Sequence, residues 1–188
     1  MNVLLVHGSF GKPFENWFPW LECELSKEDI ECIIPSFPTP RYQMYEHWDE
    51  LMSYYVNRKF VDRDTVLVGH SCGAVFIVKY VLQHKLNIKG MLTFSGYNNF
   101  ISGNEMMDNL NISFYMDDNN LRDIREYANK VFAFYGDDDP NIPQQILHDY
   151  AEKLGAIEQC VPKAGHFNST AGYNTCDLAL DTILKEFT

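Results

Sequence analysis

The chain has 188 residues, of which 46% are hydrophobic, 22% charged and 14% aromatic, and this predicts one soluble globular domain over residues 1–188. Its formal net charge of −11 repels phosphate backbones and anionic lipids, so neither nucleic acid nor a membrane surface is an expected partner. The five cysteines form no C-x-x-C pair, which favours reduced thiols and a cytoplasmic protein.

Short apolar runs that read as strands alternate with segments of helical spacing. The first run, 2–6, reads as a buried strand and not as a signal peptide, because it lacks a basic region. Further strands are expected at about 31–34, 65–69, 90–94, 131–135 and 156–161. Helices are expected at about 17–26, with Asn16 as N-cap, and at about 45–59, 72–84, 121–129, 143–154 and 176–187. Only the stretch 97–120 is left to form a lid.

Six strands alternating with helices predict an α/β fold, in which a mostly parallel sheet has helices on both faces. Ligands in such sheets bind beyond the carboxyl ends of the strands. The residues considered next all follow a predicted strand, so we expect them to meet at that edge.

The third predicted strand ends in Gly69-His70-Ser71-Cys72-Gly73, a Gly-x-Ser-x-Gly pattern. In this pattern a strand turns sharply into a helix and presents a serine at the apex. The strained turn leaves the hydroxyl free for a base to reach, and the two glycines leave room around it. We predict Ser71 as a catalytic nucleophile. Cys72 is intrinsically the better nucleophile, but it lies off the apex.

A serine nucleophile needs a general base, and the chain has six histidines. We predict His166, because it follows the last strand in a glycine-flanked turn from which an imidazole can swing over the sheet edge. His7 and His70 also follow strand ends, but their neighbours have better-defined roles. The other three lie in predicted helices and are expected at the surface: His47, His84 and His148.

The acid that orients the base is expected after the fifth strand, where Asp137, Asp138 and Asp139 follow one another. We predict Asp139, which lies three residues after Gly136 and can point back over the sheet, with Pro140 stiffening the exit. Asp138 is the second candidate. An acidic turn, or caps for the next helix, would also explain the three aspartates. The chain order serine, aspartate, histidine is that of α/β-hydrolases.

An oxyanion hole needs two backbone N–H donors aimed at the developing charge. One is predicted at Cys72, at the N-terminus of a buried helix where the dipole helps. The other is predicted in the loop after the first strand, with Ser9 as first choice and Phe10 as second. The chain has no H-E-x-x-H, G-x-G-x-x-G or P-loop motif, so no metal or other cofactor is expected.

Six motifs are spread over nearly the whole chain: His7-Gly8-Ser9-Phe10, Asn16-Trp17-Phe18-Pro19-Trp20-Leu21, Phe37-Pro38, Gly69-His70-Ser71-Cys72-Gly73, Gly136-Asp137-Asp138-Asp139-Pro140 and Ala164-Gly165-His166-Phe167. Together they resemble the small α/β-hydrolases related to retinoblastoma-binding protein 9, a family of compact serine hydrolases. The resemblance implies a three-layer fold of about six mostly parallel strands in the order 2-1-3-4-5-6, without a large cap domain. It also implies Ser71 as nucleophile, Asp139 as acid and His166 as base.

The family name brings the retinoblastoma protein as a partner, through a Leu-x-Cys-x-Glu motif. In Leu21-Glu22-Cys23-Glu24-Leu25 a leucine replaces the final glutamate, inside a helix whose leucines are expected to be packed. Because the motif is not intact, the sequence does not support that partner.

We therefore expect a serine hydrolase of the carboxylesterase type (EC 3.1.1) that cleaves a small ester, thioester or amide through an acyl-enzyme on Ser71. Its expected partner is a small-molecule acyl substrate, held in a shallow site lined by some of five aromatic residues: Phe10, Phe37, Phe114, Tyr115 and Phe167. Two alternatives keep the same fold. One is a catalytically weak binding or scaffold protein, and the other is a perhydrolase or acyl transferase.

Overall fold

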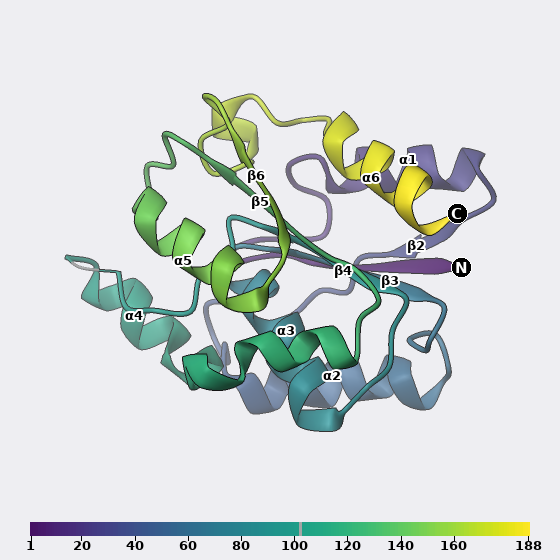
Figure 1. Cartoon of the computed structure of the whole chain (residues 1–188), viewed down its shortest axis with the longest axis horizontal. Coiled ribbons are helices and arrows are strands. Elements are labelled where there is room, and N and C mark those ends of the chain that lie inside the picture. Colours follow the sequence, from purple (N-terminus) through teal and green to yellow (C-terminus); the bar gives the residue numbers. More distant parts are fainter. Residues whose placement is uncertain (102) are drawn as a thin grey trace.

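The structure is a computed structural model that describes residues 1–101 and 103–188, and it contains a six-stranded sheet (Figure 1). The strands lie in the order β2-β1-β3-β4-β5-β6, and each neighbouring pair is parallel, which confirms the predicted fold and strand order. Each strand lies within two residues of its predicted bounds. The strands are β1 (Asn2–Val6), β2 (Glu31–Ile33), β3 (Thr65–His70), β4 (Gly90–Phe94), β5 (Val131–Gly136) and β6 (Ile157–Val161).

Helices cover both faces of this sheet (Figure 1). Helices α1 (Phe18–Lys27) and α6 (Asp177–Phe187) pack on one face, and α2 (Tyr45–Asn57), α3 (Cys72–His84) and α5 (Gln144–Leu154) pack on the other. That residues 1–188 form one domain stays a prediction. In the described part of the chain, no helix is both long enough and apolar enough to span a bilayer.

The strands alternate their side chains between two hydrophobic cores, one on each face. Along β1, Leu4 and Val6 contribute to the core under α3, whereas Val3 and Leu5 contribute to the core under α1. This follows from the two-residue period of a strand, and it explains why β1 reads as a continuous apolar run. Strand β6 is different, because it lies at the edge of the sheet and is largely exposed.

The first helix begins later than predicted, and its N-cap differs from the prediction. Trp17 occupies the N-cap position, and Pro19 lies in the first turn as expected. Asn16 has a positive φ of 55°, and its side-chain oxygen accepts a hydrogen bond from the N–H of Ser169 at 2.9 Å. The prediction of Asn16 as N-cap is therefore wrong, because the side chain holds a distant loop and not its own helix.

The leucines of α1 pack as expected. Leu21 and Leu25 are both fully buried in the core on that face of the sheet. In the segment that resembles a Leu-x-Cys-x-Glu motif, the leucines are thus committed to the fold.

The helix expected at 121–129 is a 3₁₀ helix, η2, over Asp118–Glu126. Its buried side chains are Leu121 and Ile124, which are three residues apart. Side chains three residues apart eclipse one another in a helix with three residues per turn, so this spacing suits a 3₁₀ helix as well as an α-helix. The Asp117 side chain accepts a hydrogen bond from the N–H of Asn119. This cap lets the helix begin at Asp118, earlier in the chain than predicted.

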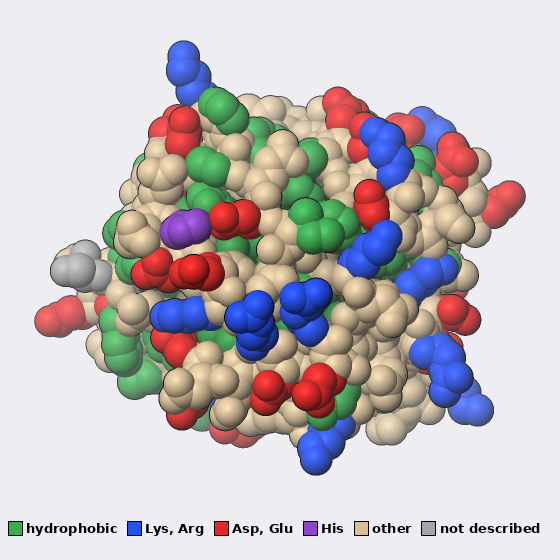
Figure 2. Space-filling model, viewed as in Figure 1, with side chains coloured by type: hydrophobic (Ala, Val, Ile, Leu, Met, Phe, Trp, Pro, Cys, Tyr) green, Lys and Arg blue, Asp and Glu red, His purple; other side chains and the backbone are tan. Residues whose placement is uncertain are grey.

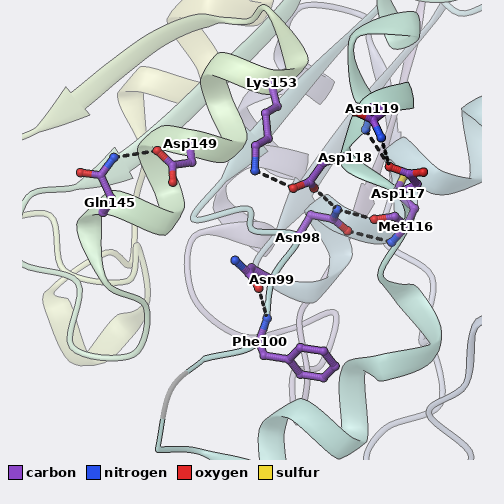
Figure 3. Close-up of polar contacts among 10 residues, drawn as sticks. All are labelled: Asn98, Asn99, Phe100, Met116, Asp117, Asp118, Asn119, Gln145, Asp149 and Lys153. Atoms are coloured by element: carbon purple, nitrogen blue, oxygen red, sulfur yellow. Dashed lines mark hydrogen bonds and ion pairs between the residues drawn. The ribbon is translucent and has the colours of Figure 1, made fainter.

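The stretch 97–120, of which residue 102 lies outside the described residues, contains the short helices α4 (Glu105–Asn111) and η1 (Ile112–Phe114). Asn98, near the start of this stretch, is hydrogen-bonded to Met116, near its end, as Figure 3 shows. Its amide donates to the carbonyl of Met116 at 2.8 Å and its oxygen accepts from the Met116 N–H at 3.0 Å. Asp118 accepts a hydrogen bond from Asn98 and forms an ion pair with Lys153 of α5, so these contacts connect the two ends of the stretch to α5.

The surface carries charges of both signs. On the face shown in Figure 2, basic side chains lie close to acidic ones, and apolar side chains are scattered between them. Mixed charge of this kind is usual for a solvent-exposed surface.

Candidate active site

Ser71 lies at a sharp turn between β3 and α3. Its φ of 56° and ψ of −124° are strained for a residue with a side chain. The turn requires glycine on either side of it. A Cβ on Gly69 would lie 2.5 Å from the Cα of Ala74, and a Cβ on Gly73 would lie 2.3 Å from the carbonyl oxygen of Val6. The structure thus has the tight geometry that the Gly-x-Ser-x-Gly pattern predicts.

The three consecutive aspartates after β5 each hold a different part of the segment that follows β6. Asp137 accepts from the N–H of Lys163 and Asp138 from the N–H of Gly165, both at 2.7 Å. The carboxylate of Asp139 lies 2.7 Å from Nδ1 of His166. Of the two candidate acids, Asp139 is therefore the one in contact with the imidazole, while Asp138 shapes the backbone of the histidine loop.

The Asp139 carboxylate is held as an anion although its side chain is completely buried. Burial raises the pKa of a carboxyl group, but hydrogen bonds from His166 and from the N–H groups of Asn141 and Ile142 outweigh it, so the pKa of Asp139 is lowered. An anionic acceptor fixes the hydrogen of the imidazole on Nδ1. The other ring nitrogen, Nε2, is then unprotonated and able to act as a base.

His70, the last residue of β3, holds the loop that carries His166 after β6. Its Nε2 donates to the carbonyl oxygen of His166 at 2.7 Å, and the two rings meet edge to face with centroids 5.0 Å apart. Burial, with help from the positive potential of His166, lowers the pKa of His70 to about 3. His70 is thus a neutral structural donor at ordinary pH, and it keeps the backbone of His166 in place.

This burial predicts a pH dependence of stability. Between the folded pKa of about 3 and the ordinary value of 6.5, the unfolded chain binds a proton at His70 that the folded chain does not. Stability from this group is therefore complete above pH 6.5 and is lost as the pH falls, by up to about 1.4 kcal/mol per pH unit. We expect the difference in the free energy of unfolding between the wild type and His70→Gln to shrink by about 1 kcal/mol from pH 6 to pH 5.

Urea titrations of both proteins at the two pH values measure this difference. Glutamine keeps an N–H donor for the His166 carbonyl but does not titrate. Buried His7, whose pKa is also lowered by burial, is present in both proteins and cancels in the comparison. A parallel pH dependence of the two proteins would contradict the neutral, buried state of His70.

The predicted oxyanion donors lie beside Ser71. Gly8 approaches so closely that a Cβ there would be 2.8 Å from the Cβ of Ser71. Cys72 is the first residue of α3, a position whose N–H has no partner within the helix. The N–H of Phe10 is already used, because it donates to the hydroxyl of Thr39 at 2.7 Å. Of the two candidates in this loop, Ser9 is therefore the better placed, and the oxyanion roles themselves stay predictions.

The Cys72 side chain is not prepared for nucleophilic attack. It is almost completely buried, and this burial raises the pKa of the thiol to about 12. A thiol with that pKa stays protonated near neutral pH, whereas attack requires the thiolate. The geometry therefore favours Ser71 over Cys72.

A cavity of about 410 Å³ opens at the carboxyl ends of the strands and brings these elements together. Ser71, His70 and His166 line it, as do Ser9 and Phe10 of the loop after β1. Residues of the stretch 97–120 line a second side of the cavity, among them Ile101 and two methionines of α4, Met106 and Met107. Residues of this stretch thus line one side of the site, and the role of the stretch as a lid stays a prediction. Within the described ranges, no three His, Cys, Asp or Glu side chains cluster in a way that would hold a metal ion.

Most of the aromatic residues predicted to contact substrate lie elsewhere. Phe10 lines the cavity and is 47% exposed. Phe37, Phe114 and Phe167 do not line it, because all three are packed in the two cores. Tyr115 packs against the core near Phe114 and does not line the cavity either. The structure therefore corrects the prediction for these four residues, whose apolar rings are used for folding.

Several lining residues were missed: some lie in or near the sequence motifs, such as Phe18, Ile142 and Thr170, and others come from the stretch without a clear pattern. Tyr97, Ile101, Asn104 and the methionines of α4 reach the cavity through the path of the chain and not through a motif. The methionines at 106 and 107 were the one available signal, since unbranched apolar side chains adapt to variable ligands.

A model of the family described as serine hydrolase matches residues 3–184. The Bacillus subtilis (strain 168) protein YdeN is 25% identical over 188 residues, which cover 99% of this chain and 96% of that protein. The serine hydrolase RBBP9 of Rattus norvegicus is 24% identical over 173 residues, covering 90% of this chain and 88% of that one.

Two solved structures show the same fold. The crystal structure of the B. subtilis ydeN gene product superposes with a TM-score of 0.86 at 23% identity, covering 97% of this chain and 96% of that one. MGS-MChE2, an α/β-hydrolase enzyme from a lagoon-sediment metagenome, superposes with a TM-score of 0.73 at 12% identity, covering 98% and 91%. The resemblance inferred from the motifs is thereby confirmed.

Proposed function

Because the chain belongs to the serine hydrolase family, we propose that it cleaves a small carboxylic ester, thioester or amide through an acyl-enzyme on Ser71. One observation carries this proposal. The buried Asp139 carboxylate lies 2.7 Å from Nδ1 of His166, whose ring shares a cavity with the strained Ser71. The acid is thus in contact with the base, and the base lies in the same cavity as the nucleophile, which supports these three roles.

In the proposed reaction Nε2 of His166 takes the proton of the Ser71 hydroxyl as the oxygen attacks the substrate carbonyl. The N–H groups of Ser9 and Cys72 stabilise the oxyanion of the tetrahedral intermediate. The intermediate collapses, the alcohol, thiol or amine leaves with the proton from His166, and an acyl ester on Ser71 results. Water, deprotonated by the same nitrogen, then attacks the acyl ester, and the resulting intermediate expels Ser71 Oγ, which takes the proton back from His166 as the acid is released. Asp139 orients the imidazole and stabilises its cationic form in both steps.

The cavity favours uncharged substrates with a small acyl group. Its volume of about 410 Å³ lies toward the low end of the range for small-molecule sites. Among its described lining residues there is no lysine or arginine, and the fixed charge there is that of Glu15. Glu15 pairs with exposed Lys12 at 3.7 Å, so an anionic substrate would find no unpaired counter-ion among the described lining side chains. Phe10 and Met106, which are 47% and 65% exposed, offer apolar contact at the rim.

A panel of p-nitrophenyl esters, run beside Ser71→Ala, tests this proposal. We expect kcat/KM to be highest for acetate or butyrate. It should fall for octanoate and dodecanoate, because their longer acyl chains do not fit in the cavity. The monosuccinate ester, which carries a carboxylate, should be cleaved about tenfold or more slowly than butyrate, a difference of about 1.4 kcal/mol. A maximum at dodecanoate would contradict the small-acyl preference, and turnover that survives in Ser71→Ala would contradict the mechanism.

A further inference from the structure

A buried group of hydrogen-bonded side chains lies behind the loop that carries Ser9. The Gln43 amide nitrogen donates to Ser9 Oγ at 2.7 Å and to the side-chain oxygen of Asn111 at 2.6 Å. The Ser9 hydroxyl itself donates to the same oxygen of Asn111 at 2.8 Å. The Asn111 amide in turn donates to the Tyr97 hydroxyl at 2.8 Å. The Gln43 amide and the Ser9 hydroxyl are thus both held by the side-chain oxygen of Asn111.

A second connection joins Gln43 to Phe10, the residue that follows Ser9 in its loop. The Thr39 hydroxyl donates to the Gln43 side-chain oxygen, and it accepts from the N–H of Phe10 at 2.7 Å. Gln43 therefore holds Ser9 through its nitrogen and Phe10 through its oxygen and Thr39. This arrangement occupies the N–H of Phe10 and so fixes the orientation of the peptide unit between Ser9 and Phe10, while the Ser9 side chain is held by Gln43.

Burying this polar group costs more free energy than burying apolar side chains of the same size would. Gln43 is 5% exposed and Asn111 is 1% exposed, and burial of an amide costs free energy unless all its bonds are made. The three segments that meet here are far apart in the chain, with Asn111 separated from Ser9 by 102 positions and from Gln43 by 68. Apolar side chains would fill the same volume without directional demands. A directional hydrogen-bonded network instead determines one position of the loop.

We propose that Gln43 is a positioning residue of the oxyanion hole, which acts through Ser9 and, by way of Thr39, through Phe10. It holds the Ser9 N–H in the direction in which the oxyanion forms, because a donor stabilises that charge only when it is aligned beforehand. Asn111, the last residue of α4, accepts hydrogen bonds from both Gln43 and Ser9, and Met106 and Met107 of the same helix line the cavity. This inference rests on the proposed function, since it assigns a role within the same reaction.

The test compares Gln43→Met with the wild type on p-nitrophenyl acetate and its thiono analogue, in which sulfur replaces the carbonyl oxygen. Methionine keeps the length of glutamine but removes both amide groups. Oxyanion donors discriminate between a developing oxygen anion and a sulfur anion, so the rate ratio of the two esters reports their alignment. We expect the ratio of kcat/KM values to fall about tenfold in Gln43→Met, with KM for the acetate changed by less than about threefold.

Two further variants keep the test decisive. Gln159→Met makes the same substitution on the exposed strand β6, and we expect it to leave the ratio unchanged. Ser9→Ala removes the hydroxyl but keeps the N–H of Ser9, and the effect of Gln43→Met should shrink in that background, because both changes break the same contact. If Gln43→Met unfolds, Ser9→Ala alone supplies the measurement, with a smaller fall in the ratio expected.

The outcomes separate this inference from the proposed function. A wild-type activity that depends on Ser71, combined with an unchanged oxygen-to-sulfur ratio in folded Gln43→Met or in Ser9→Ala, would overturn the positioning role alone. Equal losses on both esters would also overturn it, because they would indicate a general structural defect. An activity that does not depend on Ser71 would overturn the proposed function itself.

Discussion

Replacing Ser71 by alanine should lower kcat on a p-nitrophenyl ester by about 10⁴- to 10⁶-fold, while the fold and KM change little. In the proposed reaction the hydroxyl oxygen of Ser71 forms the covalent bond to the acyl group. The nearest thiol, that of Cys72, is buried and its pKa is raised to about 12, so it stays protonated. Because alanine keeps the Cβ of Ser71 and the same backbone turn, we expect the thermal midpoint to change little.

A serine that lies outside the site serves as the matched control. Ser26 is an exposed residue of α1, and Ser26→Ala should retain wild-type kcat and KM. Steady-state kinetics with enzyme purified in parallel measure both variants. A Ser71→Ala protein that keeps more than about one hundredth of the wild-type rate would contradict the role of Ser71 as nucleophile.

Replacing Asp139 by asparagine should lower kcat by about 10⁴-fold. The buried carboxylate accepts the Nδ1 hydrogen of His166 at 2.7 Å and also accepts two backbone N–H groups. An asparagine amide offers one oxygen and one N–H₂ group, so it allows the wrong imidazole tautomer and does not stabilise the imidazolium. The effect therefore falls on kcat, and it is largest near neutral pH.

Asp138→Asn is the matched control, because it changes the adjacent residue in the same loop. Asp138 accepts the N–H of Gly165 at 2.7 Å, and the asparagine oxygen can accept the same bond. We expect a loss of less than about tenfold. Kinetics of both variants at neutral pH decide between them, and a larger loss in Asp138→Asn than in Asp139→Asn would show that the acid had been misassigned.

The fold was predictable because its signals are local. The parallel strands are apolar runs buried on both faces, as in β1 and β3, and each is bounded by a loop or helix signal. The 3₁₀ helix over Asp118–Glu126 was misassigned because buried residues three positions apart suit either type of helix. The N-cap was misassigned because Asn16 has a partner, Ser169, that is distant in sequence.

The site was predictable where it depends on position along the chain, and not where it depends on tertiary packing. Ser71 and His166 follow strands whose carboxyl ends share one edge, so the topology brings them together. Phe37 and Phe114 were wrongly assigned to the cavity, since nothing in an aromatic side chain distinguishes a core ring from a lining ring. The Gln43 contacts could not be predicted at all, because they join segments with no local motif.

The most direct test of the account is the mass of the protein after treatment with a fluorophosphonate probe. We expect one adduct per chain in the wild type, located by peptide mapping on Ser71, and we expect none in Ser71→Ala. Labelling that survives in Ser71→Ala, or an adduct on another residue, would contradict the mechanism. A folded wild-type protein that stays unmodified would indicate a binding or scaffold protein on a hydrolase fold.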